Sequence, residues 1–317
     1  MDEAQGEIRV PAKAKRRNSF VDVVVRLVKT KPLGTVGGVI FLILYATGIC
    51  ADLLAPFGYN EIFLEDRLSP PTSKYILGCD HLGRDMLSRI IYGARISMIV
   101  GLCSSIIETF IATTVGLISG YRGGKTDMIV QRFVDAWMSI PGLMILLTIM
   151  TILGPGLWQV IVVIGFTGGW RASRVIRSAV IGVKENMYVE ASRAIGASTG
   201  RILIKHILPN VMAPVIIIFT INLGSNVLTE ATISFLGFGI PPPIPSWGGM
   251  LSGPGRRYMI LAPWMVLWPG LALSLAIYGI NMLGDGLRDL LDPRLRGGIG
   301  RYTTTKGRKK LEERLKK

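Results

Sequence analysis

The sequence KENMYVEASRAIGASTGRILIKHILPN (residues 184–210) leads directly into VMAPVIIIFTINLGSNVLTEATISFL (residues 211–236). The second stretch is long and apolar enough to cross a lipid bilayer, which takes about 20 residues of helix. The first stretch is too charged to enter lipid, yet too regularly patterned for a disordered linker. Together they predict a membrane-spanning helix preceded by an ordered loop in water.

Five further apolar stretches have the length of a membrane span, and they cover residues 33–56, 95–119, 136–153, 157–178 and 263–287. The composition agrees, because half of the residues are apolar and only 18% are charged, against roughly 25% in soluble domains. The mean hydropathy is +0.45. The 38 glycines suit helices that approach closely in lipid. We predict an all-α polytopic membrane protein with six transmembrane helices.

The basic residues predict how the chain is oriented. Of the 36 Lys and Arg, 29 lie in the two terminal segments and in residues 120–135 and 171–210, whereas 7 lie in residues 57–95 and 237–262. Because basic residues concentrate in cytoplasmic loops, both termini are expected in the cytoplasm. Orientation accounts for most of the net charge of +15, so we expect the lipid bilayer, and no nucleic acid, as the chain's surroundings.

The predicted organisation has five parts along the chain. They are a cytoplasmic N-terminal tail (1–32), a first transmembrane helix (33–56), an external segment (57–94), a core of five transmembrane helices (95–287) that contains the cytoplasmic loop 184–210, and a cytoplasmic basic tail (288–317). Met86, Leu87, Ile90 and Ile91 recur at helical spacing, which predicts an amphipathic helix on the outer surface within the external segment. Prolines divide residues 237–262, which predicts a structured loop.

Enzymatic motifs are incomplete in this sequence. Gly123-Gly124-Lys125-Thr126 resembles the end of a phosphate-binding loop, but Ser119 occupies the position of the first glycine and an apolar span precedes it. His81 and His206 are the two histidines, and we expect them on opposite sides of the membrane. We therefore predict no catalytic residues, no cofactor and no metal site on this chain.

Two acidic residues, Glu108 and Glu230, fall inside predicted spans, where ionisable groups often mark a functional site. Asn222, Asn226 and Glu230 follow each other at i, i+4 and i+8, which predicts a polar stripe on one helix. Such residues either line a translocation pathway or form hydrogen bonds between packed helices. The sequence leaves both interpretations open for all four residues.

The loop 184–210 has the pattern of a docking element. Residues 190–197 predict a short helix with small side chains on one side, Gly196 and Gly200 allow a break, and Pro209 is expected to end the apolar helix that follows. A face of small residues lets a partner approach closely. The alternative is an amphipathic helix on the protein surface.

Glu190-Ala191-Ser192, Gly196 and Leu208-Pro209 resemble the "EAA" loop of permeases in ATP-binding-cassette importers. Ser192 replaces the third alanine of that motif, and His206 stands where many branches carry Ile. Four further blocks are similar to the C-type permease of dipeptide, oligopeptide and nickel importers. They are LGCDHLGRDMLSRIIYGARIS (77–97), GYRGGKTDMIVQRFVDAWMSIP (120–141), TEATISFLGFGIPPPIPSWGGML (229–251) and LGDGLRDLLDPRLR (283–296).

The resemblance implies a multi-pass permease of the prokaryotic inner membrane that couples to ATPases through six loop residues: Glu190, Ala191, Ser192, Gly196, Leu208 and Pro209. The implied partners are a homologous B-type permease, two ATPase subunits that bind ATP and Mg, and an extracytoplasmic solute-binding protein facing residues 57–94 and 237–262. Short peptides are the expected substrate, with nickel chelates or oligosaccharides as alternatives. A stand-alone secondary transporter and a membrane-embedded enzyme are alternatives from other functional classes.

Overall fold

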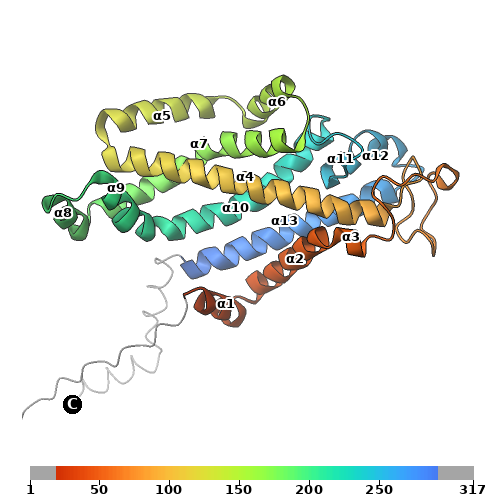
Figure 1. Cartoon of the computed structure of the whole chain (residues 1–317), viewed down its shortest axis with the longest axis horizontal. Helices are drawn as coiled ribbons and strands as arrows, with labels where there is room; N and C mark the ends of the chain where they lie inside the picture. The colour runs from red at the N-terminus through yellow and green to blue at the C-terminus, as the bar shows by residue number, and fades with distance from the viewer. Residues whose placement is uncertain (1–18, 292–317) are drawn as a thin grey trace, which may run out of the picture.

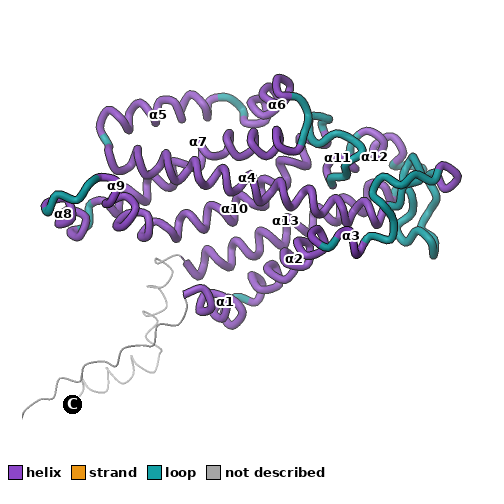
Figure 2. Tube along the Cα trace, viewed as in Figure 1, coloured by secondary structure: helices purple, strands orange, loops and turns teal. Residues whose placement is uncertain are grey.

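A bundle of long helices forms the body of the protein in the computed structural model, which describes residues 19–291 (Figure 1). In chain order these helices are α2 (Pro32–Ile49), α4 (Met86–Arg122), α7 (Leu157–Lys184), α10 (Leu208–Phe235) and α13 (Trp264–Leu291). Figure 2 shows helices and connecting loops, and no β-sheet, in this described part. The all-α membrane fold is therefore confirmed.

Shorter helices lie beside the bundle and at its ends. They are α1 (Ser19–Thr30), α3 (Ala51–Leu54), η1 (Leu64–Asp66), α5 (Gly124–Ser139), α6 (Gly142–Leu153), α8 (Met187–Ala194), α9 (Thr199–Ile202), η2 (Leu203–Ile207), α11 (Trp247–Leu251) and α12 (Gly253–Tyr258). Residues 55–85 and 236–263 gather at one end of the bundle, which we call the loop end. The opposite end carries α8 and α9, and we call it the α8 end (Figure 1).

Four helical segments of the described chain have the length and composition of a membrane span: α2, α4, the run Thr199–Phe235 that contains α10, and α13. The pair α5 and α6, bent by 88°, makes a fifth if the two together form one broken span. The sixth predicted stretch, 157–178, lies within the 28-residue helix α7. Six spans are compatible with this arrangement and stay a prediction.

Glycines let α4 and α7 pack at very short range along their length. A Cβ atom on Gly169 of α7 would lie 2.6 Å from Cβ of Ile111, and one on Gly116 of α4 would lie 2.7 Å from Cβ of Ile176. Real side chains do not approach so closely, so each position excludes any residue larger than glycine. Lipid tails are as apolar as Leu, so helix association in a membrane relies on close contacts of this kind.

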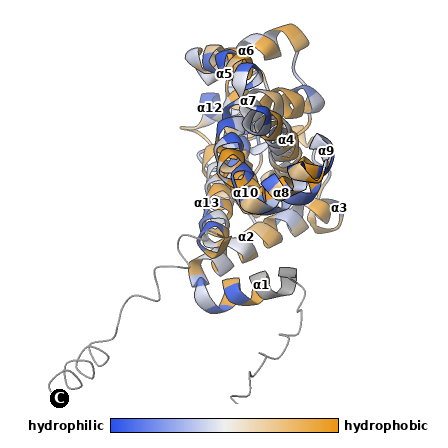
Figure 3. Ribbon diagram, turned by 90° about the vertical axis from the view of Figure 1, so that its left-hand side faces the viewer, coloured by the Kyte–Doolittle hydropathy of each residue, from blue (hydrophilic) through white to orange (hydrophobic). Residues whose placement is uncertain are grey.

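Large apolar side chains are exposed on several helices of the bundle, and Figure 3 shows in orange where hydrophobic residues lie along the ribbon. Leu42 of α2, Phe110 of α4 and Trp158 of α7 are each more than half exposed. A water-soluble protein does not normally expose apolar surface over so many neighbouring helices. These side chains are suited to contact with lipid.

The predicted amphipathic helix near residues 83–95 is not a separate element. It forms the first turns of α4, which runs without a break from Met86 to Arg122 and begins at Asp85, whose Oδ2 accepts a 2.7 Å hydrogen bond from the Ser88 backbone N–H. Trp247, which is fully buried, covers Gly93. Protein side chains bury most of this segment, so it is an integral part of the bundle, and the predicted boundary between residues 94 and 95 is wrong as a structural boundary.

Two of the predicted spans are interrupted. The stretch 136–153 is divided between α5 and α6 at Ile140, which is extended and precedes Pro141. A residue before proline is disfavoured in the helical conformation, which explains the break. The stretch 33–56 is divided at Cys50 between α2 and α3.

The prediction that Pro209 ends a helix is also wrong. The chain is helical from Thr199 to Phe235, and Pro209 lies in the first turn of α10. The π-helical turn η2 precedes it, where the Leu208 N–H donates to the Leu203 carbonyl five residues earlier. This wider turn accommodates the missing proline N–H close to a helix start, where the loss of that donor is tolerated.

Residues 237–262 form a structured loop that contains α11 and α12, as expected. Residues 19–30 of the predicted N-terminal tail form the helix α1. Residues 1–18 of that tail and residues 292–317 of the predicted basic tail lie outside the described residues.

Replacing Gly169 by Ala is expected to destabilise the fold by about 1–3 kcal/mol, because the added methyl group would overlap Ile111. Gly182 is the matched control on the same helix, since no heavy atom lies within 4 Å of a Cβ placed there. Gly182→Ala should raise helix stability by up to about 1 kcal/mol. Melting of the purified variants in detergent measures both changes, and equal effects would contradict this packing account.

Candidate functional site

A polar cluster joins α4 to α10 inside the bundle. Glu108 of α4 is 6% exposed, and its carboxylate accepts hydrogen bonds from Nδ2 of Asn222 (2.6 Å) and Nδ2 of Asn226 (2.8 Å). Asn226 also donates to Oγ of Ser105, at 3.1 Å. We call Glu108, Asn222 and Asn226 the Glu108 cluster. A buried carboxylate is costly unless such donors surround it.

The backbone of α7 borders this cluster on a third side, next to α4 and α10. A Cβ atom on Gly168 would lie 2.5 Å from Oε1 of Glu108. Gly168 therefore leaves the space that the carboxylate occupies, while the neighbouring Gly169 holds α7 against α4. Sequence reasoning missed Gly168, although the Gly168-Gly169 pair within an apolar span is a detectable signal of close helix approach.

The Glu108 cluster lines an open groove of about 380 Å³. Trp137 of α5 and Arg171 of α7 also line it, together with the smaller polar side chains Thr167, Ser225, Thr229 and Thr232. Because the groove combines amides, hydroxyls and one guanidinium, it can exchange hydrogen bonds with a polar solute at many points. Neither Trp137 nor Arg171 was singled out from the sequence, since they lie on helices other than the polar stripe.

Glu230 has different surroundings, although it lies on the same helix as the two asparagines. It is fully buried, and its carboxylate accepts hydrogen bonds from Oγ of Ser234 (2.7 Å) and Oγ of Ser97 (3.2 Å). It does not line the groove of the Glu108 cluster. A helix advances 100° per residue, so an i+8 residue points about 80° away from residue i. The predicted stripe therefore divides, and Glu230 occupies a packed contact between α4 and α10.

The predicted coupling residues gather at the α8 end. Glu190 and Ala191 of α8 are exposed, whereas Val189 and Ser192 are buried against the bundle. Leu208 is half-buried against the same apolar cluster as Val189, and Pro209 is exposed. The structure therefore orients α8 so that the first two residues of the motif face outward.

Gly196 ends α8 with a defined turn. Its φ is +78°, its N–H donates to the Arg193 carbonyl at 3.0 Å, and the N–H of Ala197 donates to the Ser192 carbonyl at 3.1 Å. This pair of bonds is a Schellman motif, in which glycine is favoured because a side chain is strained at positive φ. No heavy atom lies within 4 Å of a Cβ placed on Gly196, so its surroundings in this chain are open.

The two departures from the loop motif contact each other. Oγ of Ser192 lies 3.4 Å from Nε2 of His206, and the same hydroxyl donates to the Tyr188 carbonyl at 2.8 Å. Ser192 and His206 thus form a polar contact at the two positions where the motif has an alanine and many branches carry an isoleucine. Beside it, Met187 and Ile195 remain 86% and 85% exposed, which leaves apolar surface available at this end.

Among residues 19–291, no group of three or more His, Cys, Asp or Glu side chains is arranged to hold a metal ion. Gly123 and Gly124 lie at the junction of α4 and α5. They connect two helices there and do not follow a strand, which a phosphate-binding loop would require.

Two stretches of the chain match known protein families. Residues 112–297 match the family described as binding-protein-dependent transport system inner membrane component. Residues 19–71 match the N-terminal TM domain of oligopeptide transport permease C.

Curated relatives cover most of the chain. The dipeptide transport system permease protein DppC of Alkalihalophilus pseudofirmus is 39% identical over 84% of this chain and 88% of its own length. The glutathione transport system permease protein GsiD of Pectobacterium atrosepticum is 38% identical over 82% and 86%, respectively. The oligopeptide transport system permease protein OppC of Bacillus subtilis is 36% identical over 84% and 88%.

Among solved structures, the inward-facing MetNI methionine ABC transporter contains a chain of similar fold. The TM-score is 0.54 at 21% identity, and the similarity covers 65% of this chain and 98% of that chain.

Glu230 is expected to contribute to stability through its packed contact. Glu230→Gln should keep most of the hydrogen bonds with Ser97 and Ser234, whereas Glu230→Ala should lower stability by about 1–3 kcal/mol because it leaves buried hydroxyls without a partner. Thermal melting in detergent compares the two variants. An alanine variant as stable as the glutamine variant would contradict the packing role.

Proposed function

Because the chain belongs to the family of binding-protein-dependent transport system inner membrane components and is a membrane-embedded permease subunit of an ABC importer, we propose that it imports short peptides. The named substrates of its relatives support this choice, since dipeptides, oligopeptides and glutathione are all small peptides. Nickel chelates and oligosaccharides are the alternative substrates, and a transport screen with all three classes would distinguish them from peptides.

The observation that carries the proposed coupling mechanism is the exposed helix α8. It presents Glu190 and Ala191 outward on a short rigid element, which the Schellman turn at Gly196 ends. We propose that this element inserts into a groove on a separate ATPase subunit, where the exposed Met187 and Ile195 are covered. Closure of the ATPases on ATP and Mg would then move α8.

Contacts inside the chain offer a route for that motion into the bundle. Val189 of α8 packs in an apolar cluster with Ile176 and Val180 of α7 and Val211 of α10. The Lys184 ammonium donates to the Gly120 carbonyl of α4 at 3.2 Å. A displacement of α8 therefore acts on α4, α7 and α10 together, and these three helices carry the groove of the Glu108 cluster.

The Glu108 cluster is proposed to line the translocation pathway. Glu108 holds the Nδ2 atoms of Asn222 and Asn226, which leaves the two amide oxygens to accept hydrogen bonds from a passing solute. A peptide backbone presents N–H groups that match such acceptors. The groove is open on one side, and a homologous B-type permease is proposed to close it, so that solute passes between the two permeases.

The α8 end is accordingly proposed to face the cytoplasm, with both termini on that side. The loop end would then face an extracytoplasmic solute-binding protein, which delivers the peptide. The expected enzymatic activity of the assembly, ATP hydrolysis, is assigned to two separate ATPase subunits.

Replacing Gly196 by Trp is expected to abolish peptide uptake while the chain still inserts into the membrane. No heavy atom of the chain lies within 4 Å of a Cβ placed on Gly196, so there is open space where the side chain begins, whereas the indole would block a docked partner and strain the positive φ. Gly200→Trp is the matched control, because Gly200 is also free of neighbours within 4 Å and lies in α9. Uptake by membrane vesicles with ATP measures the effect, and normal uptake by the Gly196 variant would refute the docking role.

Replacing Glu108 by Ala is expected to lower peptide uptake by about tenfold or more, since it releases the two asparagine amides that shape the groove and removes hydrogen bonds worth roughly 1–3 kcal/mol. The comparison variant is Glu230→Gln, whose carboxyl position lies outside the groove and should leave uptake near normal. Both are measured at equal amounts of assembled complex. Unchanged uptake with Glu108→Ala would show that the cluster only holds packed helices together and does not line the pathway.

A further inference from the structure

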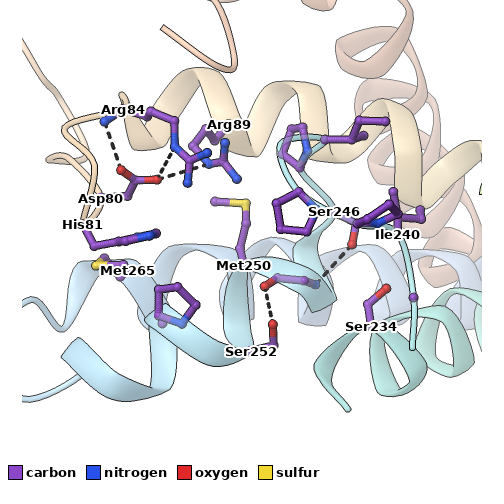
Figure 4. A pocket seen from close by; sticks show the side chains of 18 of the residues that line it. Asp80, His81, Arg84, Arg89, Ser234, Ile240, Ser246, Met250, Ser252 and Met265 are labelled. Atoms are coloured by element: carbon purple, nitrogen blue, oxygen red, sulfur yellow. Dashed lines mark hydrogen bonds and ion pairs between the residues drawn. The ribbon is translucent and has the colours of Figure 1, made fainter. Parts of the chain in front are cut away.

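A second cavity, of about 280 Å³, lies at the loop end between the start of α4, the proline-rich loop after α10, and the helices α11 and α12. Figure 4 shows it from close by. Its lining includes Pro241, Pro242, Pro245, Met250 and Met265, which makes most of its wall apolar. Arg84 and Arg89 line one edge, and the Asp80 carboxylate lies beside them and contacts both. We call this cavity the arginine pocket.

The charges at that edge are buried and do not balance. Arg84 is 5% exposed, Arg89 is 7% exposed and Asp80 is 3% exposed. Nε of Arg84 lies 2.7 Å from Oδ2 of Asp80, and Nε of Arg89 lies 3.6 Å from the same oxygen. Two guanidinium groups therefore share one carboxylate among the residues that line the cavity, which leaves one positive charge at its edge, while the buried Asp85 lies outside the lining.

Asp80 is already occupied by its own chain. Its Oδ1 accepts hydrogen bonds from the backbone N–H groups of Leu82 (2.8 Å) and Arg84 (3.0 Å). Nη1 of Arg89 donates to the Tyr59 carbonyl at 2.9 Å. Within residues 19–291, the two Nη atoms of Arg84 have no hydrogen-bond acceptor. Arg84 thus retains donors on the forked end of its side chain, which is the part that recognises carboxylates in pairs.

His81, which also lines the pocket, does not supply charge there. Burial lowers the pKa of its imidazole, and the positive charges of Arg84, Arg89 and Arg67 lower it further, while Asp80 acts in the opposite direction. The ring is therefore neutral at pH 7, and the excess positive charge resides on the two arginines.

We infer that the arginine pocket binds the carboxylate of a small solute at the loop end. A buried guanidinium without a full counter-charge is costly, and an incoming carboxylate would balance both the charge and the free Nη donors. On the proposed function, which this inference extends, the carboxylate is the C-terminal one of the transported peptide. The volume lies near the lower end of ligand pockets, which span about 300–1,000 Å³, so it suits one end of a short peptide.

The test uses the assembled importer in lipid nanodiscs and two probes, alanyl-alanine and its C-terminal amide. Saturation-transfer NMR titrations give the Kd of each. The free dipeptide is expected to bind about tenfold or more tightly than the amide, because charge-assisted hydrogen bonds contribute roughly 1.5–3 kcal/mol. Arg84→Gln should weaken the binding of the dipeptide until its Kd equals that of the amide. Arg257→Gln is the matched control, since Arg257 is exposed at the same end and does not line the arginine pocket.

Asp80→Asn provides a variant with the opposite expectation. It keeps an acceptor for the backbone N–H groups and removes the competing negative charge, so dipeptide affinity should rise. Equal binding of the dipeptide and the amide, or weaker dipeptide binding by Asp80→Asn when that variant is folded and assembled, would overturn the inference. If binding depends on the carboxylate but the assembly shows no ATP-driven peptide uptake, the carboxylate site is supported and the proposal of peptide import is contradicted.

Discussion

The close approach of α4 and α7 is the constraint on which the rest of the structure depends. Gly116, Gly165 and Gly169 carry no side chain at the contact, so the backbone of one helix meets isoleucine side chains of the other. The same contact places Gly168 against the Glu108 carboxylate. It also fixes the end of α7 from which the chain continues into α8. The groove and the docking element therefore depend on one helix pair.

Glu108 and Glu230 show how two carboxylates on neighbouring helices acquire different roles from their surroundings. Both are almost completely buried, and both are surrounded by hydrogen-bond donors, because an unpaired charge in a low-dielectric region is costly. Glu108 is held by amides that also line a groove, whereas Glu230 is held by serine hydroxyls inside a packed contact. The difference arises from position around the helix and not from residue type.

Sequence patterns predicted the membrane fold well because hydropathy over a long window reports directly on contact with lipid. They failed at Ile140, where a single residue before proline bends a span, and at Pro209, where a π-helical turn lets the helix continue. They predicted a short helix in the docking loop from a local pattern of small residues and glycine, but at residues 190–197, whereas α8 spans Met187–Ala194 and Gly196 lies in the turn that follows it. They did not identify Gly168 and Arg171 beside Glu108, because those contacts join segments far apart in sequence and depend on helix rotation. Arg84 and Arg89 lie close to Asp80 in sequence, but the cavity that they line also needs α11, α12 and the proline-rich loop after α10, which are distant in sequence.

We propose that this chain works as part of an assembly whose energy comes from separate ATPases that dock on α8. Affinity purification of the tagged chain in mild detergent, followed by mass spectrometry and by transport assays in liposomes, tests it most directly. The account predicts that a second permease and ATPase subunits co-purify, and that peptide moves only when ATP is present. A stable chain that purifies alone and moves solute in liposomes without ATP would contradict it.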